Sequence, residues 1–176
     1  MRIEKEKSIA IVVDYQEKLV PVMHETEKLI HNSCILLEGL KTLGVPMVIT
    51  QQYTKGLGTT VAPIKEAAGT EEYIDKISFT AYDSVAEHVM GKKFVIVGGI
   101  ETHICVLHTV MDLKAAGYIP VLGADCVSSR KESDKAVALD RAKAEGSIVT
   151  TYESILFELL KVAGTDTSKV IQRLIR

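Results

Sequence analysis

Tryptophan is absent from this 176-residue sequence, and aromatic side chains of all kinds make up only 5% of it. The charged side chains nearly cancel, which leaves a formal net charge of −2. Proteins that bind nucleic acids usually carry a basic surface patch, and those that bind single strands stack bases on aromatic rings. The composition therefore favours a protein with no nucleic-acid partner.

Cysteine is also scarce, because Cys34, Cys105 and Cys126 are the only three and no two of them form a CxxC motif. An odd number of widely spaced cysteines is not typical of a disulfide framework or of a structural zinc site. Neither a P-loop nor an HExxH motif occurs, so we expect no cofactor and no metal. Reduced thiols are typical of the cytoplasm.

Long apolar runs and the pattern of a secretion signal are missing as well. Residues 1–7 are rich in charge, unlike the apolar core of a signal peptide. The apolar segments 9–13 and 94–97 are far shorter than the roughly 20 residues that a membrane-spanning helix needs. We therefore expect a cytoplasmic protein without a membrane partner.

The organisation of the chain is simple, with no repeat, linker or low-complexity segment, and we expect a single domain over residues 1–176. Short apolar runs predict strands over 8–14, 45–50, 73–76, 93–99, 119–125 and 147–151. Helical spacing predicts helices over 25–43, 82–90, 102–116, 134–145, 152–160 and 168–176. This alternation predicts an α/β protein with a three-layer α/β/α, Rossmann-like fold and a mostly parallel six-stranded sheet.

Asp14, Lys76 and Cys105 each lie at or just after the end of a predicted strand. In parallel sheets of this kind, ligands bind beyond the carboxyl ends of the strands. The free amides and the dipole of a first helical turn lower the pKa of a cysteine. This predicts a Cys105 thiol that is alkylated rapidly near neutral pH. An acid, a lysine and a thiol placed together are typical of a nucleophilic site.

Two histidines offer a competing cysteine–histidine pair. His103 and His108 flank Cys105, and His108 lies three residues after it on the same helix face. A helix that continues inward from Cys105 is expected to bury His108 by packing instead. Cys34 and Cys126 have no evident base beside them and are expected to pack in the core.

Several motifs stand in a fixed order along the chain: Asp14-Tyr15-Gln16, Lys76 with Ser78-Phe79, Gly99-Ile100-Glu101-Thr102-His103-Ile104-Cys105-Val106, and Asp125-x-Val127-x-Ser129-Arg130. Together they resemble the isochorismatase-like cysteine hydrolase family, over roughly residues 7–160. The segment 51–58 is most similar to the subgroup called isochorismatase domain-containing proteins.

The resemblance implies a catalytic triad in which Asp14 accepts and donates a proton, Lys76 supplies positive charge and Cys105 is the nucleophile. It also implies a cis peptide bond between Ile100 and Glu101, and an oxyanion hole formed by the backbone N–H groups of Glu101 and Cys105. Relatives form dimers, tetramers or octamers, so the resemblance implies a homo-oligomer.

Two differences between this sequence and particular members of the family bear on the substrate class. Nicotinamidases carry metal-binding Asp-x-His where this chain has Gln51-Gln52-Tyr53-Thr54, which disfavours a metal-bound pyridine substrate. Isochorismatase itself lacks the nucleophilic cysteine, so Cys105 favours acyl transfer through a thioester.

We therefore expect a small-molecule substrate, and a hydrolase that cleaves the C–N bonds of small amides, imides or ureides. Gln16, Gln51 and Tyr53 are the candidates for substrate contacts. The alternative functions are a catalytically idle scaffold or interaction protein and a redox-sensing thiol protein.

Overall fold

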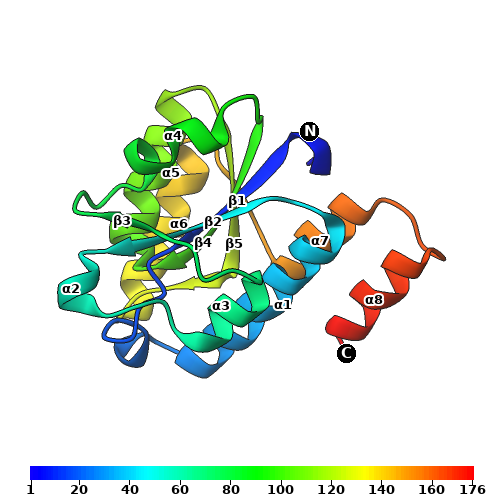
Figure 1. Cartoon of the computed structure of the whole chain (residues 1–176). Coiled ribbons are helices and arrows are strands. Elements are labelled where there is room, and N and C mark those ends of the chain that lie inside the picture. Colours follow the sequence, from blue (N-terminus) through cyan, green and yellow to red (C-terminus); the bar gives the residue numbers. More distant parts are fainter.

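The computed structural model describes all 176 residues and contains one sheet. The strand order is β3-β2-β1-β4-β5-β6, and every neighbouring pair is parallel. The strands are β1 (Ser8–Val13), β2 (Met47–Gln52), β3 (Ile74–Lys76), β4 (Phe94–Ile100), β5 (Ile119–Ser128) and β6 (Ile148–Thr150). Helices lie on both sides of the sheet (Figure 1), so the predicted three-layer α/β/α fold is confirmed.

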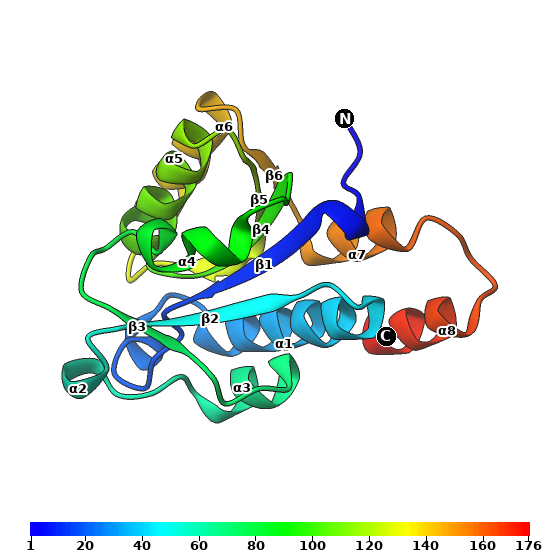
Figure 2. The ribbon, with the colours of Figure 1, turned by 45° about the horizontal axis from the view of Figure 1, so that its top comes forward.

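The helices form two layers, one on each face of the sheet (Figure 2). One layer contains α1 (Thr26–Leu43), α3 (Ala62–Ala68), α7 (Tyr152–Leu160) and α8 (Asp166–Leu174). The other contains α4 (Tyr82–Val89), α5 (Leu107–Ala115) and α6 (Glu132–Ala144), and α2 (Thr54–Leu57) is a single turn after β2. None of these helices combines the length and the apolar character that crossing a membrane requires.

Strand β1 shows why the strands read as unbroken apolar runs, since all of its residues are buried. Ile9, Ile11 and Val13 pack with the layer of α4, α5 and α6. Ala10 and Val12 pack with the opposite layer. Because side chains alternate between the two faces and both faces are covered by helices, both faces of β1 favour apolar residues.

The sheet order reverses between β1 and β4. From β1 the chain adds β2 and β3 on one side, and it then returns to add β4, β5 and β6 on the other. In open parallel sheets, ligands bind beyond the carboxyl ends of the strands at such a switch point. Asp14, which directly follows β1, and Glu101, which directly follows β4, lie at this place.

The segment after β4 differs in detail from the prediction. The helix expected over 102–116 begins as a π-helical turn, Thr102–Val106, and only then continues as α5. Turns of this kind occur mostly as single insertions within helices and often at functional sites. Cys105 lies in this turn.

Gly99 allows the end of β4 to approach β1 closely. Its φ of 151° lies in a region that favours glycine. A Cβ atom at this position would overlap the carbonyl oxygen and the Cβ atom of Val13. The absence of a side chain at Gly99 is therefore what brings the two strand ends together just before Asp14 and Glu101.

We expect Gly99→Ala to lower the free energy of unfolding by roughly 2–6 kcal/mol, the sum of backbone strain and overpacking. Gly117→Ala is the matched control, because Gly117 has a φ of 89° but open space around its Cβ position; there only backbone strain of about 1–2 kcal/mol is expected. Chemical denaturation measures both changes. Equal losses would contradict the tight contact between Gly99 and Val13.

Candidate functional site

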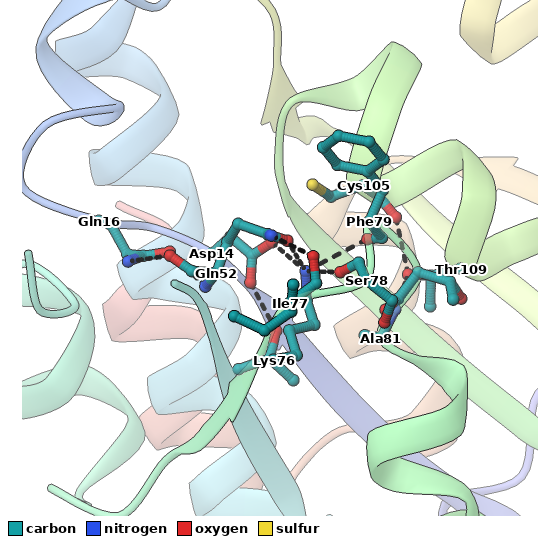
Figure 3. Close-up of polar contacts among 12 residues, drawn as sticks. Asp14, Gln16, Gln52, Lys76, Ile77, Ser78, Phe79, Ala81, Cys105 and Thr109 are labelled. Atoms are coloured by element: carbon teal, nitrogen blue, oxygen red, sulfur yellow. Dashed lines mark hydrogen bonds and ion pairs between the residues drawn. The ribbon is translucent and has the colours of Figure 1, made fainter. Parts of the chain in front are cut away.

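The three residues predicted as a triad meet at the carboxyl end of the sheet (Figure 3). Asp14 directly follows β1, Lys76 is the last residue of β3, and Cys105 lies in the turn after β4. Because β2 lies between β1 and β3, the Lys76 side chain reaches across the end of β2 to meet Asp14. Topology thus joins three residues that are far apart in the sequence.

Asp14 and Lys76 form a fully buried ion pair. The distance from Lys76 Nζ to Asp14 Oδ2 is 2.7 Å, and both side chains have 0% of their surface exposed. The other carboxylate oxygen, Oδ1, accepts a hydrogen bond of 2.8 Å from the Thr50 hydroxyl. Both oxygens of Asp14 are therefore held in place by donors from β2 and β3.

The Lys76 ammonium group has three further acceptors. It donates to Gln52 Oε1 at 2.7 Å and to the carbonyl oxygens of Ser78 and Phe79 at 3.1 and 3.2 Å. A buried charge is tolerated only when it is paired and hydrogen-bonded. In the segment that follows β3, the backbone carbonyl groups of Ser78 and Phe79 therefore surround the Lys76 ammonium group. We call these two carbonyl groups the carbonyl cage.

The environment of Cys105 overturns the prediction of a lowered thiol pKa. Burial, followed by the negative charge of Asp14, raises the pKa of the Cys105 thiol to about 12, and the opposing effect of Lys76 is smaller. A hydrogen bond to Asp14 and the charge of Glu101 raise the pKa further. The favourable first-turn amides do not outweigh these effects. At neutral pH, Cys105 is therefore a protonated thiol beside the Asp14 carboxylate.

Side chains from the β5–α6 connection hold the turn that carries Cys105. The Glu101 carboxylate accepts hydrogen bonds from the Arg130 backbone N–H at 3.2 Å and from Arg130 Nε at 3.0 Å. His103 Nδ1 lies 2.9 Å from the Ser129 hydroxyl. The peptide bond between Ile100 and Glu101 is cis. The turn is thus attached at Glu101 and at His103, which both precede Cys105 in the sequence.

Two of the candidate substrate contacts are engaged within the protein. Gln16 has 0% of its surface exposed, and its Nε2 donates to the carbonyl oxygens of Gln52 and Gly58 at 3.0 and 2.7 Å. Gln51 is 1% exposed and its Nε2 donates to Thr60 Oγ1 at 2.9 Å. These amides hold the loop between β2 and α3, and contact with a substrate stays a prediction for them.

Tyr53, the third candidate substrate contact, is placed differently. It is 50% exposed, and its backbone N–H donates to the carbonyl oxygen of Lys76 at 2.8 Å. Its side chain is therefore available to a ligand near the end of β3.

The structure places the other candidate residues, His108, Cys126 and Cys34, in different environments. His108 is exposed, and its ring packs edge-on against Phe79 with the ring centroids 6.2 Å apart, so the expectation that packing buries His108 is wrong. The helix presents this residue to its surface one turn after the buried Cys105. Cys126 is 0% exposed within the core, as predicted. Cys34 is half-buried and packs against a separate core cluster that contains Leu37 and Ile64. All three thiols are free.

Thr50 and Gln52 are site residues that the sequence reasoning missed. They alternate along β2 and therefore point to the same face of the sheet at its carboxyl end. Strand β2 ends in three consecutive polar residues after an apolar beginning, and this polar end is the signal that identifies them. No group of three or more His, Cys, Asp or Glu side chains in the structure is arranged to hold a metal ion.

The raised thiol pKa gives a testable rate profile. We expect the rate of Cys105 alkylation by iodoacetamide to rise about tenfold per pH unit from pH 7 to 10 without a plateau, because only the thiolate reacts. In urea-unfolded protein, the same rate should level off near pH 9, and at pH 8 it should be about 1,000-fold faster. Peptide mass spectrometry separates Cys105 from the other cysteines. A plateau near pH 9 or below in the native protein would refute the raised pKa.

Removal of one partner from the buried ion pair is expected to be costly. Lys76→Met leaves the Asp14 carboxylate buried without its counter-charge, so unfolding should become easier by about 3–5 kcal/mol. Lys169→Met is the control, because Lys169 and Asp166 form an ion pair with 59% and 99% of their side chains exposed, and little change is expected there. A denaturant midpoint in Lys76→Met that matches wild type would show that the pair does not stabilise the fold.

Comparison with known proteins identifies relatives that extend over almost the whole chain. A family model described as the isochorismatase domain matches residues 8–154. The secreted isochorismatase effector Isc1 of Phytophthora sojae (strain P6497) is 34% identical over 99% of this chain and 87% of that protein. Isochorismatase domain-containing protein 1 of Salmo salar is 36% identical over 93% of this chain, which spans only 59% of that protein.

A solved structure agrees with these relatives. The MAR1 ribonuclease from Caenorhabditis elegans superposes with a TM-score of 0.94 at 32% identity, covering 99% of this chain and 92% of that one. The sheet and its helix layers thus belong to a known architecture. Since the family model matches most of the chain and relatives exceed 30% identity, the chain belongs to the isochorismatase family, whose members are generally hydrolases.

Proposed function

We propose that this protein hydrolyses the C–N bond of small amides, imides or ureides through a thioester on Cys105. One observation carries the proposal: a buried, protonated thiol lies beside a carboxylate that is itself paired with a buried lysine. A carboxylate next to a neutral thiol is a proton acceptor in place before a substrate arrives. The family to which the chain belongs supports a hydrolase of some kind.

The first half-reaction uses Asp14 twice. Asp14 takes the proton from Cys105 Sγ while the sulfur forms a bond to the substrate carbonyl carbon, and the carbonyl oxygen gains the negative charge. The backbone N–H groups of Glu101 and Cys105 are proposed to stabilise this oxyanion. Asp14 then gives its proton to the leaving nitrogen, the C–N bond breaks, and an amine or ammonia departs from the thioester.

Hydrolysis of the thioester uses Asp14 again, first as proton acceptor and then as proton donor. Asp14 accepts a proton from water as the water oxygen attacks the thioester carbon, the C–S bond breaks, and the sulfur recovers the proton from Asp14. The cycle thus returns Cys105 to a neutral thiol and Asp14 to a carboxylate. The Lys76 ammonium group lies 2.7 Å from Asp14 and supplies the positive charge of the site.

A redox-sensing role for Cys105 has less support than hydrolysis. Oxidation to sulfenic acid proceeds through the thiolate and needs access to the oxidant. Cys105 is 6% exposed, and burial together with Asp14 raises the pKa of its thiol to about 12. A catalytically idle scaffold could have the same fold, but it would not require a buried ion pair beside the thiol.

The partners and the location remain predictions. A homo-oligomer, whether dimer, tetramer or octamer, is proposed from the family resemblance. YcaC from Escherichia coli, with 24% identity, is described as an octameric hydrolase of unknown specificity, and a likeness at this level concerns the fold alone. A cytoplasmic location is proposed from the reduced thiols, whereas one relative is described as a secreted effector.

The proposal is tested by measuring ammonia or amine release from a panel of small amides, imides and ureides. Cys105→Ala and Asp14→Asn should each lower the rate by at least about 10³-fold, while Cys34→Ala is the matched control and should leave it unchanged. Single-stranded RNA belongs in the panel, because one solved relative is described as a ribonuclease. Release that persists in Cys105→Ala, or RNA cleavage that does not need Cys105, would overturn the proposal.

A further inference from the structure

We propose that Thr109 is a positioning residue that couples the carbonyl cage around Lys76 to the turn that carries Cys105. The inference rests on the proposed function only in that Lys76 and Cys105 act in one reaction. The contacts that carry it are independent of any substrate, and all of its residues are seen together in Figure 3.

The Thr109 hydroxyl makes two hydrogen bonds in opposite directions. Thr109 lies in α5 and is 0% exposed. Its Oγ1 donates to the carbonyl oxygen of Cys105 at 2.7 Å and accepts from the backbone N–H of Ala81 at 2.8 Å. One hydroxyl therefore links the backbone of the nucleophile to a separate segment of the chain.

That second segment leads directly back to Lys76. Ala81 is fully buried and ends the stretch that runs from β3 to α4. Within it, the carbonyl oxygens of Ser78 and Phe79 accept from Lys76 Nζ. The direction in which these two carbonyls point depends on where the segment is attached. The Phe79 ring packs against His108 of α5, and the hydrogen bond from Ala81 to Thr109 is the attachment of the segment's backbone to α5.

A second threonine shows that this geometry is more than a common feature of helices. Threonine hydroxyls in helices often donate to the carbonyl oxygen four residues earlier. Thr42 does so, donating to the Glu38 carbonyl oxygen at 2.8 Å, but it is exposed and joins no other segment. Thr109 adds the acceptor role toward a buried backbone N–H, which would lack this partner if the hydroxyl were removed.

The charged groups that face the Cys105 thiol are the ones that loss of the Thr109 hydroxyl could disturb. These are Asp14, Lys76 and Glu101, from the ends of β1 and β3 and the start of the π-helical turn. Of the three, Lys76 alone is held by the segment that Thr109 attaches. Loss of the Thr109 hydroxyl is therefore expected to loosen Lys76 while leaving the contacts of Asp14 with Thr50 and of Glu101 with Arg130 in place.

The test measures Lys76 itself, by NMR of the full chain uniformly labelled with ¹⁵N, which reports both the lysine ammonium groups and the backbone amides. The Lys76 ammonium protons should exchange slowly with water in wild type, and the signal is assigned by its loss in Lys76→Met. In Thr109→Val, which keeps the shape but removes the hydroxyl, we expect exchange at Lys76 and at the Ala81 amide to be about tenfold faster, the effect of one lost hydrogen bond. Thr109→Ser should restore both rates, and Thr42→Val should change neither.

The outcomes separate coupling from a local structural role. Faster exchange at Ala81 with an unchanged Lys76 signal would overturn the inference, because Thr109 would then only satisfy a backbone N–H. If Thr109→Val fails to fold by circular dichroism, Thr109→Ala removes the hydroxyl without placing a methyl group against Ala81 and is read in the same way. With a substrate in hand, kcat should fall in Thr109→Val and KM should stay unchanged. Because the exchange measurement needs no substrate, failure of the hydrolase proposal does not affect its result.

Discussion

The buried ion pair between Asp14 and Lys76 is the constraint on which the rest of the site depends. Its 2.7 Å contact is fully buried, so both charges need the remaining partners that the protein supplies. Thr50 satisfies the second oxygen of Asp14, and Gln52 with two backbone carbonyls satisfies Lys76. These requirements determine how β2 ends and how the chain leaves β3.

Burial and the Asp14 member of the pair determine the protonation state of the thiol. A cysteine in a first helical turn would ordinarily be acidified, but burial and the Asp14 charge act in the other direction and raise the pKa of Cys105 to about 12. The site is therefore organised around proton transfer from a neutral thiol to a carboxylate, and a standing thiolate is not needed. This arrangement also protects the thiol from unwanted alkylation and oxidation while no substrate is bound.

The sequence predicted the fold and the three meeting residues because both follow from local patterns. Apolar runs of strand length alternate with helical spacing, and Asp14, Lys76 and Cys105 stand where parallel strands end. It did not predict the direction of the Cys105 pKa shift, since that depends on burial by distant segments. The internal amide contacts of Gln16 and Gln51 and the exposure of His108 likewise depend on how loops pack. The sequence does not distinguish Thr109 from other helical threonines, because its contact with Ala81 depends on how two distant segments pack.

The central claim, a thioester on Cys105, is tested most directly by intact-mass measurement of the protein during turnover, quenched with acid on the millisecond to second scale. The account predicts a transient adduct equal to the acyl part of the substrate, located on the Cys105 peptide and absent in Cys105→Ala. Turnover without any adduct on Cys105 at the shortest quench times, together with activity that survives in Cys105→Ala, would contradict it.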